Sequence, residues 1–338
     1  MADYPSLTVT ALGNKGSGKT TFLIGMYAHL SAGQNGYFLS ADPDTDLNLA
    51  NKWDKLLDDG VLPPPNEADN ISYKFRFLDG LRPLLGVDWL DYRGGALEEE
   101  TGSASGDVAG LQDRLRKSDC VYLVLDGGYL VDPVSNATRL GIMRRASLRR
   151  MTSLLQTAVD ARIEAKTSPP SIVILITKTD LIPPARRDAL VPDITTLLPV
   201  CFSEGLTTLV CPVMLGDFGI NPEQRVNPRD IAPHNLHLPI IFGLAEYMYQ
   251  LSFGIRQMSM TQSQRNATLE KNLGALRSGA GAFFRRGKIV GAAQELRKAR
   301  EEQETMNAVE KAAADRATAL FDELSGLALF RDGNEVNR

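Results

Sequence analysis

Residues 13–20 read Gly-Asn-Lys-Gly-Ser-Gly-Lys-Thr, in which two glycines lie five positions apart and a Lys-Thr pair follows. This is the pattern of a phosphate-binding loop, called the phosphate loop below. The apolar run 7–12 precedes it, and a helix-forming run starts at Thr21. That strand–loop–helix context is required because the loop amides must point inward at the helix N-terminus to surround a phosphate. A plain glycine-rich turn is the alternative interpretation, but it does not account for the complete pattern.

The residues of the phosphate loop have distinct expected roles. Its glycines allow the backbone angles of the wrap and the close approach of a ligand. Lys19 would neutralise the β- and γ-phosphates of a nucleotide, and the Thr20 hydroxyl would hold Mg²⁺. The residues predicted to contact the phosphates are Gly13, Asn14, Lys15, Gly16, Ser17, Gly18, Lys19, Thr20 and Thr21.

The composition limits the class of protein. A chain of 338 residues with 43% hydrophobic residues suffices for one large α/β domain with an appendage, or for two modest domains. A net charge of −4 gives no reason to expect nucleic acid as a partner. The three cysteines lie far apart in apolar runs, so we interpret them as buried thiols in a reducing compartment.

The sequence also gives no indication of export or membrane insertion. The N-terminus lacks a basic segment followed by an apolar one, so we expect no secretory signal. The longest apolar stretch, residues 238–255, contains Glu246 and Gln250, which favour a buried helix over a membrane span. We therefore expect a cytoplasmic protein without a transmembrane segment.

Two strands are predicted after a long polar segment. Residues 71–77 alternate strictly between apolar and polar, which is typical of a half-buried edge strand. Asp79-Gly80 then indicates a tight hairpin, and the more continuously apolar run 84–90 indicates an interior strand. The two strands should be antiparallel neighbours in an otherwise parallel sheet.

The second of these strands ends in Asp91-Tyr92-Arg93-Gly94. A carboxylate at this end of a strand, beside a phosphate loop, is well placed to hold Mg²⁺ directly or through water. The Gly94 amide would donate a hydrogen bond to a terminal phosphate. By itself Asp-x-x-Gly is a common and nearly uninformative pattern, so its value depends on what else accompanies it.

A buried strand over residues 171–176 is followed by Thr177-Lys178-Thr179-Asp180, and a last strand ends near Leu215. With these features in order, the sequence resembles the translation-factor-related class of P-loop GTPases, whose third diagnostic motif is Asn/Thr-Lys-x-Asp. The resemblance implies a Ras-like fold that binds GTP and GDP with Mg²⁺. It also assigns Lys19, Asp91 and Gly94 to catalysis and Thr20 with Asp91 to the metal.

The resemblance further implies how the base is held. Asp180 would accept hydrogen bonds from guanine N1 and N2, Lys178 would pack its stem along the base, and Leu215 would lie near O6. Thr177 opens the same motif. The argument also holds without the family. A base that leaves the buried carboxylate unpaired binds with a large loss of free energy, so such a site discriminates strongly between guanine and other bases.

More narrowly, residues 89–95 and the long polar segment before them resemble the GTPase domains of bacterial conflict-associated double-GTPase systems. The similarity to the class covers about residues 6–255. The tail, residues 256–338, is rich in helix-forming residues but carries a thin apolar stripe. We therefore expect a GTPase domain over 1–255 and a helical extension over 256–338 that binds a protein partner or a second copy.

Two departures from the family pattern concern hydrolysis. Between Thr21 and Thr101 the only threonine is Thr45, so the usual γ-phosphate-sensing threonine of the first switch is missing, and Asn66 occupies the expected neighbourhood. Gly95 stands where many relatives carry a water-positioning glutamine. The candidate replacements are Arg93, Glu98, Glu99 and Glu100.

The expected protein is an α/β GTPase with a mostly parallel sheet, one antiparallel edge strand and a helical C-terminal extension. Its expected activity is slow Mg²⁺-dependent hydrolysis of GTP, stimulated by self-association or a partner. One alternative is a scaffold that binds GTP or GDP without hydrolysis, which Gly95 and the missing threonine favour. Another is an ATPase or small-molecule kinase, which the motif at residues 177–180 disfavours.

The motif leads to a test of base selectivity. Asp180→Asn should weaken GTP binding and raise the relative affinity for xanthosine triphosphate, because an amide donates a hydrogen bond where xanthine offers a carbonyl. Titration calorimetry with both nucleotides measures the change. Equal binding of ATP and GTP by the unmodified protein would contradict the guanine assignment.

Overall fold

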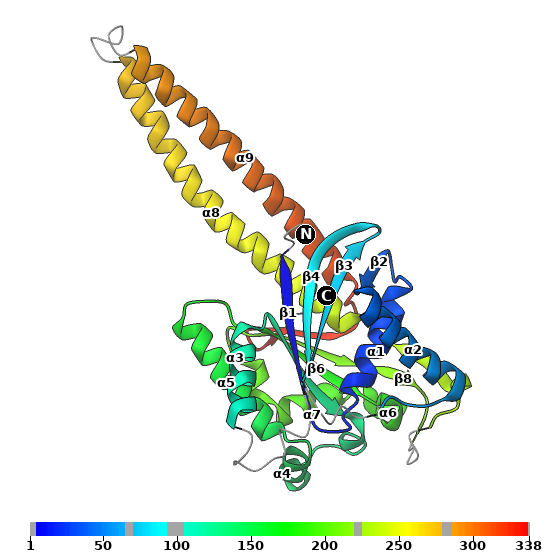
Figure 1. Cartoon of the computed structure of the whole chain (residues 1–338). Helices are drawn as coiled ribbons and strands as arrows, with labels where there is room; N and C mark the ends of the chain where they lie inside the picture. Colours follow the sequence, from blue (N-terminus) through cyan, green and yellow to red (C-terminus); the bar gives the residue numbers. More distant parts are fainter. Residues whose placement is uncertain (1–4, 65–69, 93–104, 220–224, 279–285, 337–338) are drawn as a thin grey trace. The chain divides into compact units, whose positions relative to one another are not determined.

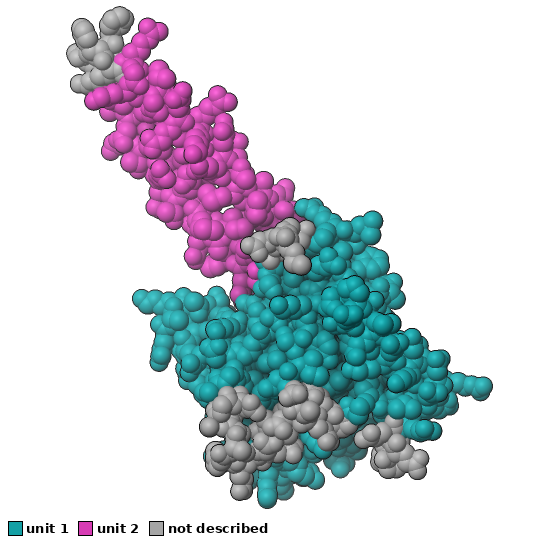
Figure 2. Space-filling model, viewed as in Figure 1, with its two compact units in different colours: residues 1–243, 324–338 teal, residues 244–323 magenta. Residues whose placement is uncertain are grey.

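The computed structural model describes residues 5–64, 70–92, 105–219, 225–278 and 286–336. It contains two compact units, shown in Figure 2: residues 1–243 with 324–338, and residues 244–323. The first unit is an α/β domain with a large, mostly parallel mixed sheet, and the second is helical. The α/β class and the helical C-terminal region are therefore confirmed. The expected boundary after residue 255 falls inside one continuous helix, α8 (Leu238–Ser278), because the apolar pattern ends there while the helix continues.

A nine-stranded sheet forms the centre of the first unit, in the order β11-β10-β7-β6-β5-β1-β4-β3-β2. The five neighbours β4, β1, β5, β6 and β7 are parallel, and antiparallel strands flank them on both sides. The strands are β1 (Ser6–Leu12), β2 (Tyr37–Ser40), β3 (Ile71–Asp79), β4 (Arg82–Asp91), β5 (Cys120–Asp126), β6 (Ser171–Thr177), β7 (Thr207–Pro212), β10 (Ala328–Arg331) and β11 (Asn334–Glu335), with β8 (Met214–Gly216) and β9 (Ile231–His234) forming a separate ladder.

The predicted hairpin is present, since β3 and β4 pair antiparallel across the turn after Asp79. The prediction that this strand lies at the edge is wrong, because β2 pairs along its outer side. Phe75 and Phe77 of β3 are accordingly buried. The four-residue strand β2 is too short to show an alternating pattern, so the sequence did not reveal it.

Helices cover both faces of the sheet (Figure 1). Helices α3, α5 and α7 contribute to one apolar core, whereas α1 packs its buried Phe22 beside Trp89 of β4 and Tyr122 of β5. The helices of this unit are α1 (Lys19–Ser31), α2 (Pro43–Asp59), α3 (Ser105–Lys117), α4 (Asn136–Arg145), α5 (Leu148–Glu164), α6 (Pro184–Arg187), α7 (Leu190–Leu197) and the first residues of α8.

The apolar spacing of residues 139–166 is that of one long helix, but the structure has two helices there. Helix α4 ends at Arg145, and α5 restarts at Leu148 after Ser147, whose φ of 50° lies in the left-handed region. The apolar spacing continues through this break, since Met151 and Leu155 lie in the same core as Ile142. Periodicity alone therefore could not locate the break.

The second unit is a pair of antiparallel helices, α8 from residue 244 onward and α9 (Arg286–Asp322). The Ser259 hydroxyl donates to Asn307 Oδ1 at 2.6 Å, and Asn266 Nδ2 donates to Gln303 Oε1 at 2.5 Å. The thin stripe of the tail thus finds a partner surface within the chain, as a helix of this composition requires. Among the described helices of both units, none has a stretch long and apolar enough to cross a bilayer.

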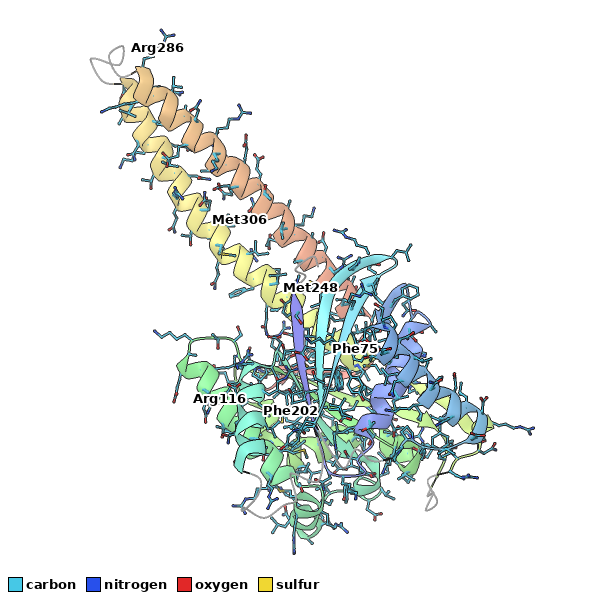
Figure 3. The ribbon with its side chains drawn as sticks, viewed as in Figure 1. Phe75, Arg116, Phe202, Met248, Arg286 and Met306 are labelled. Atoms are coloured by element: carbon cyan, nitrogen blue, oxygen red, sulfur yellow. The ribbon has the colours of Figure 1, made fainter. Side chains whose placement is uncertain are left out.

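The chain returns from the second unit to the sheet. Strand β10 pairs antiparallel with β7, and Phe330 packs edge-on against Phe202 with 4.8 Å between ring centroids. Phe202 is labelled in Figure 3. The expectation that the whole tail lies outside the α/β domain is therefore wrong. Strand β10 has only four residues and follows a long helical stretch. The sequence therefore showed no pattern that assigned it to the sheet.

The return strand should contribute strongly to stability. Leu329 is 2% exposed, so Leu329→Ala should lower the free energy of unfolding by about 2–5 kcal/mol. The matched control is Leu81→Ala, at a leucine that is 96% exposed, which should change it by less than about 0.5 kcal/mol. Urea denaturation followed by circular dichroism measures both. Equal effects at the two leucines would contradict the placement of β10.

Candidate functional site

A cavity of about 500 Å³ opens at the carboxyl ends of β1 and β6. Strand β1 lies between β4 and β5, and the crevice beside such a central strand is the usual ligand position of open α/β sheets. The cavity volume suits a small molecule of nucleotide size. Residues of the phosphate loop and of the Thr177–Asp180 motif line the same cavity, although they are 160 positions apart where Thr177 contacts Ser17.

The phosphate loop has the predicted left-handed glycines, with φ of 76° at Gly16 and 84° at Gly18. Lys19 is buried, and its Nζ donates to the carbonyl oxygens of Gly13 at 2.7 Å and Asn14 at 2.8 Å. The Thr177 hydroxyl donates to the Ser17 carbonyl at 2.7 Å. The loop is therefore held from inside by its own lysine and from β6 by a threonine.

Asn14 fixes the other side of the loop. Its Nδ2 donates to the Arg145 carbonyl at 2.5 Å, and the Tyr129 hydroxyl donates to the same oxygen at 3.3 Å. The Arg145 guanidinium lies 5.7 Å from the centroid of the Tyr129 ring. The end of α4 is thus tied to the phosphate loop, a long-range contact for which the sequence carried no signal.

Thr20 and Asp91 meet where a metal is expected. The Thr20 hydroxyl donates to Asp91 Oδ2 at 2.8 Å, and Asp91 is 1% exposed. Burial raises the pKa of the Asp91 carboxyl above its usual range, while the Thr20 hydrogen bond and the Lys19 charge oppose the shift. Within the described residues, Asp91 Oδ1 is buried without a hydrogen-bond partner.

These oxygens suit Mg²⁺, which prefers hard oxygen ligands and keeps several waters, so one or two protein ligands suffice. In the part of the chain that the structure describes, no cluster of three or more His, Cys, Asp or Glu forms an alternative metal site. Gly94, the third residue predicted for catalysis, lies outside the described residues, as do Asn66, Arg93, Gly95 and Glu98 to Glu100.

The same cavity contains the residues expected to hold a base. Asp180 is half-buried, and its Oδ2 accepts a hydrogen bond from the Phe218 amide at 3.2 Å. Burial raises the pKa of the Asp180 carboxyl, and backbone N–H groups oppose the shift. Lys178 donates to Asp126 Oδ2 at 2.5 Å, so its ammonium is fixed while the residue lines the cavity with Leu215. The structure therefore brings together all the predicted site residues that it describes.

Part of the cavity wall was not predicted. Leu62, Pro63 and Pro64 line it from the segment after α2, and Phe218 and Val226 line it from the segments beside the β8–β9 ladder. The only signal in the sequence was the length of the polar segment after the phosphate loop, which loop-length statistics associate with function.

Comparison with known proteins adds no assignment: neither a protein-family model nor a curated protein sequence matches this chain. The chemistry of the site is therefore argued from its own residues.

Two lysines of the phosphate loop allow a matched test. Lys19→Ala should weaken binding of both GTP and GDP by about 10- to 100-fold, because hydrogen bonds to charged groups contribute about 1.5–3 kcal/mol. Lys15→Ala, at an exposed lysine lining the same cavity, should have the smaller effect on GDP. Titration calorimetry measures both affinities. Unchanged GDP binding by Lys19→Ala would mean that the loop does not hold phosphates.

Proposed function

We propose that the first unit is a Ras-like P-loop GTPase domain that binds GTP and GDP with Mg²⁺ and hydrolyses GTP slowly. The observation that carries the proposal is a single cavity lined both by the phosphate loop and by Thr177, Lys178 and Asp180. The first group matches the chemistry of phosphates and the second that of a guanine edge. The central position of β1 in a parallel sheet supports the Ras-like fold.

In this proposal each polar group changes partner when the nucleotide binds. The Lys19 ammonium, which bonds the carbonyls of Gly13 and Asn14, turns to the phosphate oxygens. Thr20 and Asp91 hold Mg²⁺, which supplies positive charge against the phosphates. Asp180 accepts from guanine N1 and N2, and adenine cannot satisfy the carboxylate in the same way.

The proposal of slow hydrolysis rests on the same site. Phosphoryl transfer by such sites depends on positioning a water molecule and neutralising charge. Among the described residues lining the cavity, Lys15 and Lys19 supply charge, but none is a glutamine or a histidine that would orient water. A partner or a second copy would then supply the missing group, and we place this interaction in the helical part of residues 256–338.

A scaffold that binds the nucleotide without hydrolysis is the second candidate. Gly95 in place of glutamine favours it, as does a helical second unit suited to protein contacts. A P-loop ATPase is less consistent with a carboxylate at position 180. The three buried cysteines, Cys120, Cys201 and Cys211, are not in disulfides, which supports a reducing, cytoplasmic location.

Turnover measurements distinguish the first two candidates. The isolated chain should hydrolyse GTP at roughly 10⁻⁴ to 10⁻³ s⁻¹, and a supplied catalytic group should accelerate it by about 10³-fold or more. Phosphate release is measured against protein concentration, with and without co-purified proteins. Tight GTP binding with no turnover under any condition would favour the scaffold, and a concentration-independent rate near about 1 s⁻¹ would show a complete catalytic set within one chain.

A further inference from the structure

Two segments that are far apart in the chain join beside the cavity. The Val226 amide donates to the Gly60 carbonyl at 2.8 Å, and Val61 pairs with Arg225 as an isolated antiparallel bridge. The first segment follows α2, and the second precedes β9. We call this contact the Gly60–Val226 junction.

Gly60 is suited to the junction by its backbone. Its φ of 66° lies in the left-handed region, and its amide closes α2 by donating to the Leu56 carbonyl at 3.0 Å. A Cβ atom at this position would lie 1.9 Å from the Val226 carbonyl oxygen. No side chain fits there unless the two segments separate, so the close approach depends on glycine.

The junction holds a wall of the cavity in place. Val226, which belongs to the junction, lines the cavity. Leu62 and Pro63, which directly follow the junction in the chain, line it as well. A second attachment fixes the neighbouring wall, since the Asp217 amide donates to the Asp230 carbonyl at 3.2 Å and the Phe218 amide donates to Asp180. Asp180, the carboxylate expected to hold the base, thus lines a cavity that has two walls with apolar side chains.

We propose that the Gly60–Val226 junction is a clamp that retains the nucleoside part of the bound nucleotide, with Leu62 and Val226 as its apolar contacts. The proposal rests on the proposed nucleotide-binding function. A purine has two flat apolar faces, and hydrogen bonds along its edge leave those faces to be covered by side chains. Release of the nucleotide then requires the wall to move, so the strength of the junction determines the dissociation rate.

A reversible cross-link tests the clamp. The hydrogen bond between Val226 and Gly60 joins the residues that flank the Val61–Arg225 pair on one side. Val61 and Arg225 are therefore a non-hydrogen-bonded antiparallel pair, for which the typical Cα separation is about 4.5 Å. This is within the range of about 4.4–6.8 Å that a disulfide spans. The double variant Val61→Cys/Arg225→Cys should therefore cross-link on oxidation, while the three native thiols are buried.

Full-length protein is loaded with tritiated GDP and Mg²⁺, and release into excess unlabelled GDP is followed by filter binding. The oxidised double variant should release GDP at least about 10-fold more slowly than the same protein after dithiothreitol, which corresponds to about 1.4 kcal/mol in the barrier. The two single-cysteine variants and the unmodified protein should show no response to dithiothreitol.

A second variant loosens the clamp. Gly60→Ala should accelerate GDP release at least about 10-fold, since a Cβ atom at this position forces the segments apart. Gly36→Ala is the matched control, because Gly36 also has a positive φ, 86°, but a Cβ atom there meets nothing within 4 Å. The control carries the backbone strain without the steric clash.

The outcomes separate the clamp from the proposed function. Equal release rates from the oxidised and reduced double variant, with GDP bound in both, would overturn the clamp and leave nucleotide binding intact. Absence of GDP binding by the unmodified protein would overturn both proposals. If Gly60→Ala does not fold, the cross-linked variant decides the question alone.

Discussion

The constraint on which the rest of the site depends is that the phosphate loop must keep its amides directed into one cavity. A loop of this kind has no ladder or helix of its own to hold it, so its carbonyls and side chains need external partners. Lys19 bonds two loop carbonyls from inside, Thr177 bonds the Ser17 carbonyl from β6, and Asn14 bonds the end of α4. Two other elements, β6 and α4, therefore converge on these eight residues.

Burial of charge is concentrated at the same place. Asp91 is 1% exposed and Lys19 is 8% exposed, and the Lys19 charge partly opposes the rise in the Asp91 pKa that burial causes. Desolvating a carboxylate is costly unless its oxygens are satisfied, and Thr20 satisfies only one of them. Perturbed carboxylates are concentrated at functional sites, and Asp91 bonds Thr20 of the phosphate loop. This supports the proposed role of Asp91 beside a metal.

The helical unit is inserted into the α/β domain rather than added to its end. The chain leaves the sheet through α8, returns through α9, and completes the sheet with β10 against β7. The cost of closing so long a connection grows only slowly with its length, so a well-packed final strand offsets it. The polar pairs Ser259–Asn307 and Asn266–Gln303 fix the register of the two helices, because a shifted pairing would leave their buried groups unsatisfied.

The sequence by itself determined the features that depend on neighbouring residues: the phosphate loop, the β3–β4 hairpin, the buried strand β6, and the Thr177–Asp180 motif. Glycine spacing and apolar periodicity are local, so each could be read without knowing the fold. Only the tertiary structure decided that β2 and β10 complete the sheet and that the helix breaks at Ser147. It alone also placed Gly60 against Val226. These features are set by pairing between distant segments, and a short strand or a single left-handed residue satisfied by such a partner leaves no periodic trace in the sequence.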